Sequence, residues 1–292
     1  MGGFLAFLLS RATGLDLFLF VQAGYLVLSL AGLAIVFAGT RRELANNPDR
    51  QRYLLLFLAA LPLGLAGARL IPIVQDGVLA GRLTLGLVTS GGLVFYGGAL
   101  AYLGALRLGC RFLGLSPWPL LDAVCRLAPL GHAFGRLGCF FGGCCFGAVT
   151  DGPTGVRFPA GSPAFLQHKT EGLLPLGAVA SLPVHPSQLY EALGDLALYG
   201  SLLALSRRPG GLPPGRATTL YLLGYAALRF TLEFFRGDTI RGLYGGFSTS
   251  QYVAAAVVAG TLLVVTRRSG PSRQGRIRVR PAGNAASSSP KR

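Results

Sequence analysis

Seven apolar segments, each about as long as a membrane is thick, constrain this chain more than any other feature of its sequence. A spanning helix needs about 20 mostly apolar residues. Only 13% of the 292 residues are charged and 51% are hydrophobic, so such segments make up most of the chain. We predict an all-α, polytopic membrane protein with about seven transmembrane helices. The expected spans are 17–38, 53–74, 91–112, 119–140, 186–206, 217–236 and 249–266.

The basic residues predict the orientation of these helices. The formal net charge is +16, from 27 Lys and Arg against 11 Asp and Glu. With the N-terminus outside, most of the basic residues fall on the cytoplasmic side, near 41–52, 107–111 and 207–216 and after position 266. Cytoplasmic loops carry the excess of Lys and Arg, so we predict an N-out/C-in chain. No aromatic residues are interleaved with the charges of the tail, which argues against a nucleic-acid partner.

The domain organisation follows from the same pattern. We expect one seven-span membrane domain over 1–266, with an outer loop at 148–184 that could be a lid or a recognition arm. Residues 267–292 are rich in Arg, Ser, Pro and Gly and contain no acid. We expect a disordered basic cytoplasmic tail there, and attraction to anionic membrane lipid is the alternative.

Ionisable side chains inside the expected spans are costly and therefore mark a functional site. From the helical rise of 1.5 Å per residue, five polar groups lie within about 10 Å of the outer membrane edge. We expect them to line one cavity that opens sideways to the outer leaflet. These residues are Arg69, Tyr96, Arg136, Glu191 and Arg229.

Two interpretations of this polar layer stay open. In the first, the charges form salt bridges that hold the helices in register, such as Arg229 with Glu233 at i,i+4. A further pair, Asp122 with Arg126, is expected nearer the inner side. In the second, the three arginines of the layer outnumber Glu191 and Glu233 and bind an anion. The planar guanidinium suits phosphate, and phospholipid head groups supply phosphate, so we favour the second.

A segment rich in glycine and cysteine follows this layer, HAFGRLGCFFGGCCFG at 132–147. Its glycines are expected to break the helix at the outer surface, where a glycine-rich turn offers backbone N–H groups to an anion. A zinc site usually has four ligands with C-x₂-C pairs, and this spacing lacks them, so we predict no metal. A disulfide, a catalytic thiol and simple packing remain open for Cys139, Cys144 and Cys145.

Several motifs together resemble a known family. The segments GGLVFYGG at 91–98 and GRLGCFFGGCCFG at 135–147 resemble G-G-x-S-F-H-G-G and G-R-x-G-N-F-x-N-G-E-x-x-G. HPSQLYEA at 185–192 and RFTLEFFRGD at 229–238 resemble H-P-x-Q-L-Y-E and R-F-x-x-E-x-x-R-x-x-D, and GARL at 67–70 also fits. In order and spacing the chain resembles the bacterial prolipoprotein diacylglyceryl transferases.

The resemblance implies a specific reaction and location. Such enzymes move the diacylglyceryl group of phosphatidylglycerol onto the lipobox cysteine thiol of a prolipoprotein signal peptide. A thioether forms and glycerol phosphate leaves, at the outer leaflet of the bacterial cytoplasmic (inner) membrane, with no metal or soluble cofactor. The implied catalytic residues are Arg136, Arg229, Tyr96 and Glu191. The implied substrate-binding residues are Arg69, His132, Gly138, Cys139, Gly143, Cys144, Gly147, His185, Gln188, Tyr190, Glu233, Arg236 and Gln251.

Four departures from the family motifs bear on the chemistry. Tyr96 stands where the motif has histidine, Cys139 and Gly142 where it has asparagine, and Cys144 where it has glutamate. The residue that takes the proton from the acceptor thiol therefore lies elsewhere, or the positive charge of the arginines suffices to form the thiolate, or the activity differs. Alternative functions are a same-fold transferase for another lipid or acceptor, a lipid-binding or transport protein, and a thiol-redox protein.

Overall fold

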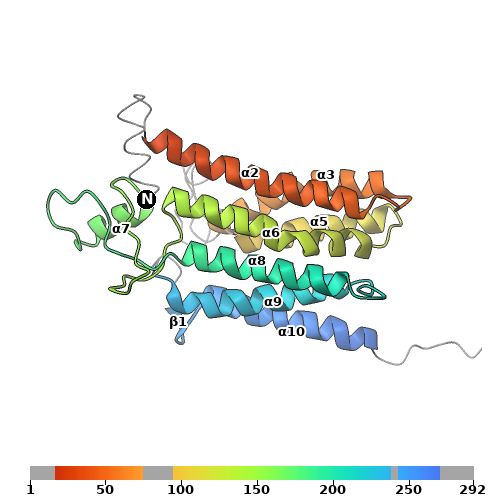
Figure 1. Cartoon of the computed structure of the whole chain (residues 1–292). Helices are drawn as coiled ribbons and strands as arrows, with labels where there is room; N and C mark the ends of the chain where they lie inside the picture. Colours follow the sequence, from red (N-terminus) through yellow and green to blue (C-terminus); the bar gives the residue numbers. More distant parts are fainter. Residues whose placement is uncertain (1–16, 75–94, 238–242, 270–292) are drawn as a thin grey trace, which may run out of the picture.

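A computed structural model describes residues 17–74, 95–237 and 243–269. Within these ranges, seven long helices run side by side in a bundle (Figure 1). Each coincides with an expected apolar segment, so the all-helical prediction is confirmed. The helices are α2 (Leu17–Glu43), α3 (Arg50–Pro72), α5 (Phe95–Phe112), α6 (Trp118–Gly142), α8 (Ser187–Ser206), α9 (Arg216–Leu232) and α10 (Thr249–Ser269).

The helices follow one another across the molecule. Helices α2, α6, α8, α9 and α10 contact their neighbours in that order, while α3 and α5 form a pair beside them (Figure 1). The segments Ala23–Glu43 of α2 and Arg50–Leu70 of α3 are long and apolar enough to cross a membrane. Ser250–Thr266 of α10 is a shorter apolar helix. These apolar helices agree with the expectation of a helical membrane protein.

Glycines let α2 and α6 approach closely. A Cβ on Gly32 would lie 2.7 Å from the carbonyl oxygen of Gly131, and one on Gly138 would lie 3.2 Å from that of Tyr25. Small residues at such contacts are typical of membrane helices, because they bring the backbones together. Because Gly138 packs against α2 in this way, it does not interrupt helix α6.

Helix α6 continues further than the sequence predicts. The expectation that Gly135 and Gly138 break the helix is wrong, since the helix runs to Gly142. The next residue, Gly143, caps the helix, and its φ of 64° is the left-handed conformation that favours glycine. Glycine weakens a helix by only about 1 kcal/mol, and packing against α2 outweighs that.

Short turns close one end of the bundle. There the side chain of Asp122 caps α9, accepting hydrogen bonds from the backbone N–H of Thr218 at 2.9 Å and from its hydroxyl at 2.6 Å. Arg126 pairs instead with Glu43 of α2. The expected Asp122–Arg126 pair is therefore wrong, because each residue finds its partner on a neighbouring helix.

A folded arm covers the opposite end, where the sequence predicts an outer loop (Figure 1). It contains α7 (Pro163–Thr170) and a small apolar core formed by Phe146, Phe158, Ala164 and Val184. The ring of His168 is buried, and its Nδ1 accepts a hydrogen bond from the N–H of Leu182 at 3.2 Å.

Beyond α9 the chain forms a short 3₁₀ turn, η2 (Glu233–Phe235), and a two-stranded hairpin. The hairpin consists of β1 (Leu243–Tyr244) and β2 (Phe247–Ser248) and leads directly into α10. The backbones of Gly147 and Arg236 form an isolated antiparallel bridge, which joins the start of the arm to the end of η2.

Candidate functional site

A buried glutamate between two arginines forms the centre of the polar layer. Glu191 of α8 lies with Oε1 3.0 Å from Nη2 of Arg136 on α6, and with Oε2 3.1 Å from Nη1 of Arg229 on α9. The Glu191 side chain is 2% exposed and that of Arg229 is 5% exposed, whereas that of Arg136 is 20% exposed. Three helices thus place their charges at one point, with Arg136 on its accessible side.

Further groups of α9 and of η2 complete this cluster. Nη2 of Arg229 lies 3.2 Å from Oε2 of Glu233, which is the expected i,i+4 pair. The hydroxyl of Tyr225 lies 3.5 Å from Oε1 of Glu191. The carboxylates of Glu191 and Glu233 therefore pair with the two arginines. The salt bridges expected under the first interpretation are present.

Asp195 lies one turn further along α8 and is missing from the expected site. Its side chain is fully buried, and both carboxylate oxygens lack a hydrogen-bond partner within the described part of the chain. Its helical spacing from Glu191 places it on the same face of α8. That spacing was the available signal, but Asp195 belongs to no family motif that the sequence displays.

The first turn of α8 binds the cysteine-containing loop. Nε2 of Gln188 donates a hydrogen bond to the carbonyl oxygen of Cys144 at 2.7 Å. The hydroxyl of Ser187 donates to the carbonyl oxygen of Cys145 at 2.9 Å. Gln188 is one turn from Glu191, so the loop and the charged cluster are held by the same helix.

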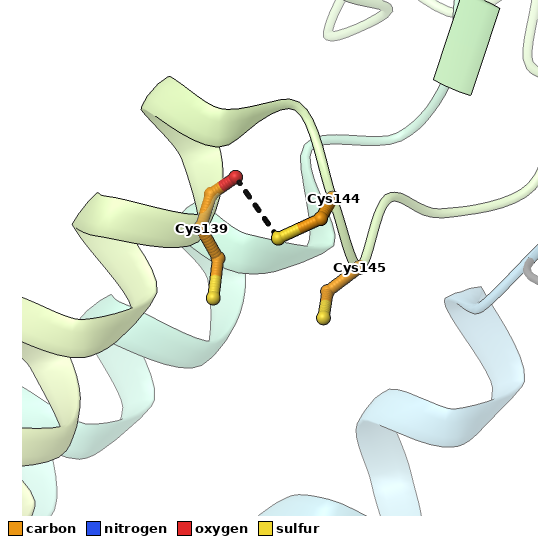
Figure 2. A group of neighbouring side chains, drawn as sticks. All are labelled: Cys139, Cys144 and Cys145. Atoms are coloured by element: carbon orange, nitrogen blue, oxygen red, sulfur yellow. Dashed lines mark hydrogen bonds between the residues drawn. The ribbon is translucent and has the colours of Figure 1, made fainter. Parts of the chain in front are cut away.

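The three cysteines of this region converge (Figure 2). Cys139 comes from the last turns of α6, and Cys144 and Cys145 from the loop that follows, with the three sulfur atoms within 4.8 Å of one another. The thiol of Cys144 lies 3.7 Å from the carbonyl oxygen of Cys139. Hydrogen bonds with the other two thiols, together with the charges of Arg236 and Arg136, lower the pKa of the Cys145 thiol.

The motif residues at the start of α8 join the arm to the bundle. Nδ1 of His185 lies 3.2 Å from the hydroxyl of Tyr190, which donates to the hydroxyl of Thr154 at 2.8 Å. The N–H of Gly147 donates to the carbonyl oxygen of His185 at 2.8 Å. A Cβ on Gly147 would lie only 2.5 Å from the carbonyl oxygen of Phe235, so this position requires glycine.

His132 and Gln251 make side-chain hydrogen bonds with residues outside this cluster. Nδ1 of His132 lies 3.3 Å from the hydroxyl of Tyr221. Oε1 of Gln251 accepts a hydrogen bond from the N–H of Ser248 at 2.9 Å, and the N–H of Gln251 donates back to the Ser248 hydroxyl. Gln251 thus fixes the start of α10.

The remaining expected residues, Arg69 and Tyr96, belong to the α3–α5 pair. Arg69 is half-buried near the end of α3, and Tyr96 is the second residue of α5, with its side chain outside what the structure describes. A cavity of about 340 Å³ lies at the other end of the bundle, beside Glu43 and Arg126. The structure therefore brings Arg136, Glu191 and Arg229 together, and the single cavity with Arg69 and Tyr96 stays a prediction.

The residues that form this site lie within a segment that matches a known protein family. The sequence pattern of one family, described as prolipoprotein diacylglyceryl transferase, matches residues 17–267. The chain belongs to this family. The match contains the helices of the bundle, the arm and the charged cluster, and it confirms the resemblance drawn from the motifs.

Three relatives bear the name phosphatidylglycerol–prolipoprotein diacylglyceryl transferase. The protein of Vibrio vulnificus (strain CMCP6) is 35% identical over 193 residues, 65% of this chain and 64% of the relative. That of Stenotrophomonas maltophilia is 34% identical over 248 residues, 79% and 81% of the two chains. That of Pseudoalteromonas atlantica is 33% identical over 257 residues, 82% and 83%. The chain thus spans slightly less than two thirds of the Vibrio protein and more of the other two.

Proposed function

We propose that this protein transfers the diacylglyceryl group of phosphatidylglycerol to the lipobox cysteine of prolipoproteins. The observation that carries the proposal is the pair of arginines, Arg136 and Arg229, held on either side of the buried Glu191 in a helical membrane bundle. Family membership and the names of the relatives support the same reaction. Phosphatidylglycerol and the prolipoprotein lipobox are the proposed partners.

The proposed chemistry assigns a role to each charge. The acceptor sulfur attacks the glyceryl carbon that carries the phosphate ester, the C–O bond breaks, and the electron pair leaves with glycerol phosphate. Arg136 is the more exposed arginine and binds the departing phosphate, because a guanidinium stabilises the negative charge that develops. Glu191 and Arg229 position Arg136. The remaining motif residues, including Arg69, Tyr96, Glu233 and Arg236, line the lipid and acceptor sites in this proposal.

The proposed placement is a seven-span protein of the bacterial cytoplasmic membrane, N-out and C-in. Large apolar side chains on the bundle surface support it, since Leu55 is 60% exposed and Leu100 is 73% exposed. Contiguous apolar surface on a protein marks contact with lipid or a partner. The turns flanked by the basic residues near 41–52, 107–111 and 207–216 lie at the end opposite the arm (Figure 1), and the arm then lies at the outer face. Residues 1–266 form the membrane domain, and 267–292 the basic tail.

Expression in a bacterium depleted of its own transferase tests the reaction. We expect prolipoproteins to gain the mass of one diacylglyceryl group on the lipobox cysteine, measured by mass spectrometry of a reporter lipoprotein. An unmodified reporter, with the protein correctly inserted, contradicts the proposal. A different mass on the reporter, or modification of another acceptor, supports a same-fold transferase with another substrate instead.

The arginine assignment is tested with matched variants. We expect Arg136→Ala to abolish modification, because phosphate departure loses its cation. Arg126→Ala is the control, since Arg126 sits on a helix-to-helix ion pair of the same kind at the other end of the bundle. Equal loss in both variants would show that ion pairing alone matters, and would contradict the phosphate role of Arg136.

A further inference from the structure

The three sulfur atoms of Cys139, Cys144 and Cys145 have nearly the geometry of a metal site. They lie within 4.8 Å of one another. Three thiolates that bind one zinc ion at 2.3 Å in a tetrahedral arrangement have their sulfurs about 3.8 Å apart. The side chains therefore need to move by only about 1 Å to close around an ion. The C-x₄-C-C spacing conceals this arrangement, because a helix end and a turn bring the three positions together.

The backbone is built to direct these thiols towards each other. Helix α6 ends at Gly143, and the N–H of Cys144 returns to the carbonyl oxygen of Cys139 at 3.2 Å. Cys145 has a φ of 59°, the left-handed conformation that is unfavourable for a residue with a side chain. Strain of this kind persists only where the surroundings hold it, and it gathers at functional sites. Here Ser187 and Gln188 hold the loop through the carbonyls of Cys145 and Cys144.

The charges around the cluster suit a zinc ion with three thiolates. Such a group carries one net negative charge, and the positive charges of Arg236 and Arg136 both act on Cys145. All three cysteines are only half-buried, so one side of the cluster stays open. Zinc sites with three protein ligands keep the fourth position for water or substrate and are typical of catalysis.

We propose that Cys139, Cys144 and Cys145 bind one zinc ion and leave its fourth position to the acceptor cysteine thiol. The inference rests on the proposed transferase function and deepens it. The acceptor thiol loses its proton to water when it binds the ion, because a coordinated thiol is deprotonated. Its sulfur then attacks the glyceryl carbon, the C–O bond breaks, and the electron pair leaves with the phosphate towards Arg136.

The position of the cluster fits this role. Cys139 is one turn from Arg136 on α6, and Gln188, which binds the Cys144 carbonyl, is one turn from Glu191 on α8. The nucleophile and the leaving phosphate would thus meet at adjacent points of the same two helices. Tyr96 stands where the family motif has histidine, and a zinc-bound thiolate needs no imidazole to form.

Metal binding by the purified full chain is the first test. Under reducing conditions we expect one zinc ion per chain, with each of Cys139→Ala, Cys144→Ala and Cys145→Ala weakening the affinity at least about tenfold. The control is Cys110→Ala/Cys125→Ala, which removes two buried cysteines away from the cluster and keeps the affinity. Sub-stoichiometric binding, or equal loss in the control, overturns the site.

A second measurement covers variants that fail to fold. In the unaltered chain, bound zinc should protect Cys139, Cys144 and Cys145 from alkylation, as read by mass spectrometry of the peptides. Alkylation at the same rate with and without zinc overturns the proposal. So does a disulfide within the cluster that re-forms after reduction in the presence of zinc.

Cobalt absorption tests the open position. With Co²⁺ in place of zinc, a lipobox peptide with cysteine should shift the absorption bands, while the matched serine peptide leaves them unchanged. Identical spectra overturn the acceptor role. This assay needs no lipid and is therefore independent of the transferase test. In the transferase test itself, a reporter that zinc-free protein modifies at the full rate overturns the zinc inference and leaves the transferase function standing.

Discussion

At the scale of single residues, Glu191 governs the charged cluster. It is the carboxylate that faces both Arg136 and Arg229, so its neutralisation removes the charge with which both guanidinium groups pair. Removing one partner of a buried ion pair typically costs about 3–5 kcal/mol. We expect Glu191→Gln to lower the thermal unfolding temperature in detergent and to abolish lipid modification of the reporter.

The matched variant for this prediction is Glu43→Gln. Glu43 also binds an arginine of α6, but the pair is more exposed, with side-chain exposures of 24% and 29%. Pairs open to solvent contribute up to about 1 kcal/mol. A Glu191→Gln protein that unfolds at the temperature of Glu43→Gln would contradict the central role of Glu191.

His168 makes the arm sensitive to pH. Burial lowers the pKa of its imidazole below the ordinary value, opposed by the charge of Glu171. The unfolded arm therefore binds the proton more readily than the folded arm. The contribution of His168 is complete above about pH 6.5 and is lost as the pH falls towards the folded-state pKa.

We therefore expect lower hydrogen-exchange protection factors, taken relative to the intrinsic exchange rate at each pH, in residues 148–184 at pH 5 than at pH 7.5, because a protonated ring cannot accept the N–H of Leu182. His168→Gln serves as the control, since its amide oxygen still accepts but does not titrate. An equal loss of protection in the control would assign the effect to other groups.

The residue-scale site is partly predictable from sequence. Arg136, Glu191 and Arg229 are visible because charges in apolar helices are costly and rare. The helical spacing also places Asp195 on the face of Glu191, although it lies outside the motifs. His168 is not visible in this way, since it becomes buried only when the arm folds. The closeness of Cys139 to Cys145 depends on a left-handed turn that no spacing rule reveals.

At the scale of elements, the contact between α2 and α6 depends on glycine. A methyl group on Gly32 would meet the backbone oxygen of Gly131 at 2.7 Å, and backbone cannot move aside as a side chain can. We expect Gly32→Ala to destabilise the bundle by about 1–3 kcal/mol, as overpacking does. The apparent unfolding temperature in detergent measures it.

Gly104→Ala in α5 provides the comparison. Nothing lies within 4 Å of a Cβ at Gly104, so the better helix propensity of alanine should stabilise that helix by up to about 1 kcal/mol. Opposite signs for the two variants would support close packing. A stabilised Gly32→Ala would show that the two helices are not in contact there.

The helices were predictable because each apolar segment is long. Their bounds agree with the expected spans to within a few residues at most ends, for example 119–140 against Trp118–Gly142. The arm was not predictable as a folded unit, because its core of Phe146, Phe158, Ala164 and Val184 joins residues far apart in the chain. The partners of Asp122 and Arg126 likewise come from neighbouring helices.

At the scale of the whole molecule, the two ends of the bundle differ in charge and structure. Short basic turns close one end, and the arm covers the other (Figure 1). With the basic turns facing the cytoplasm, a cysteine placed at Gly177 of the arm should react with a membrane-impermeant reagent in intact spheroplasts. One placed at Asn46 should react only after lysis. The reverse pattern would contradict the proposed N-out/C-in orientation.

One contact carries a consequence for how the two substrates bind. Gln188 and Ser187 fasten the cysteine loop to the same helix that holds Glu191 against both arginines. If the acceptor peptide displaces that loop when it binds, the first turn of α8 moves with it and shifts Glu191 against the phosphate-binding Arg136. Lipid and acceptor should therefore influence each other's affinity, and by thermodynamic reciprocity the influence is equal in both directions.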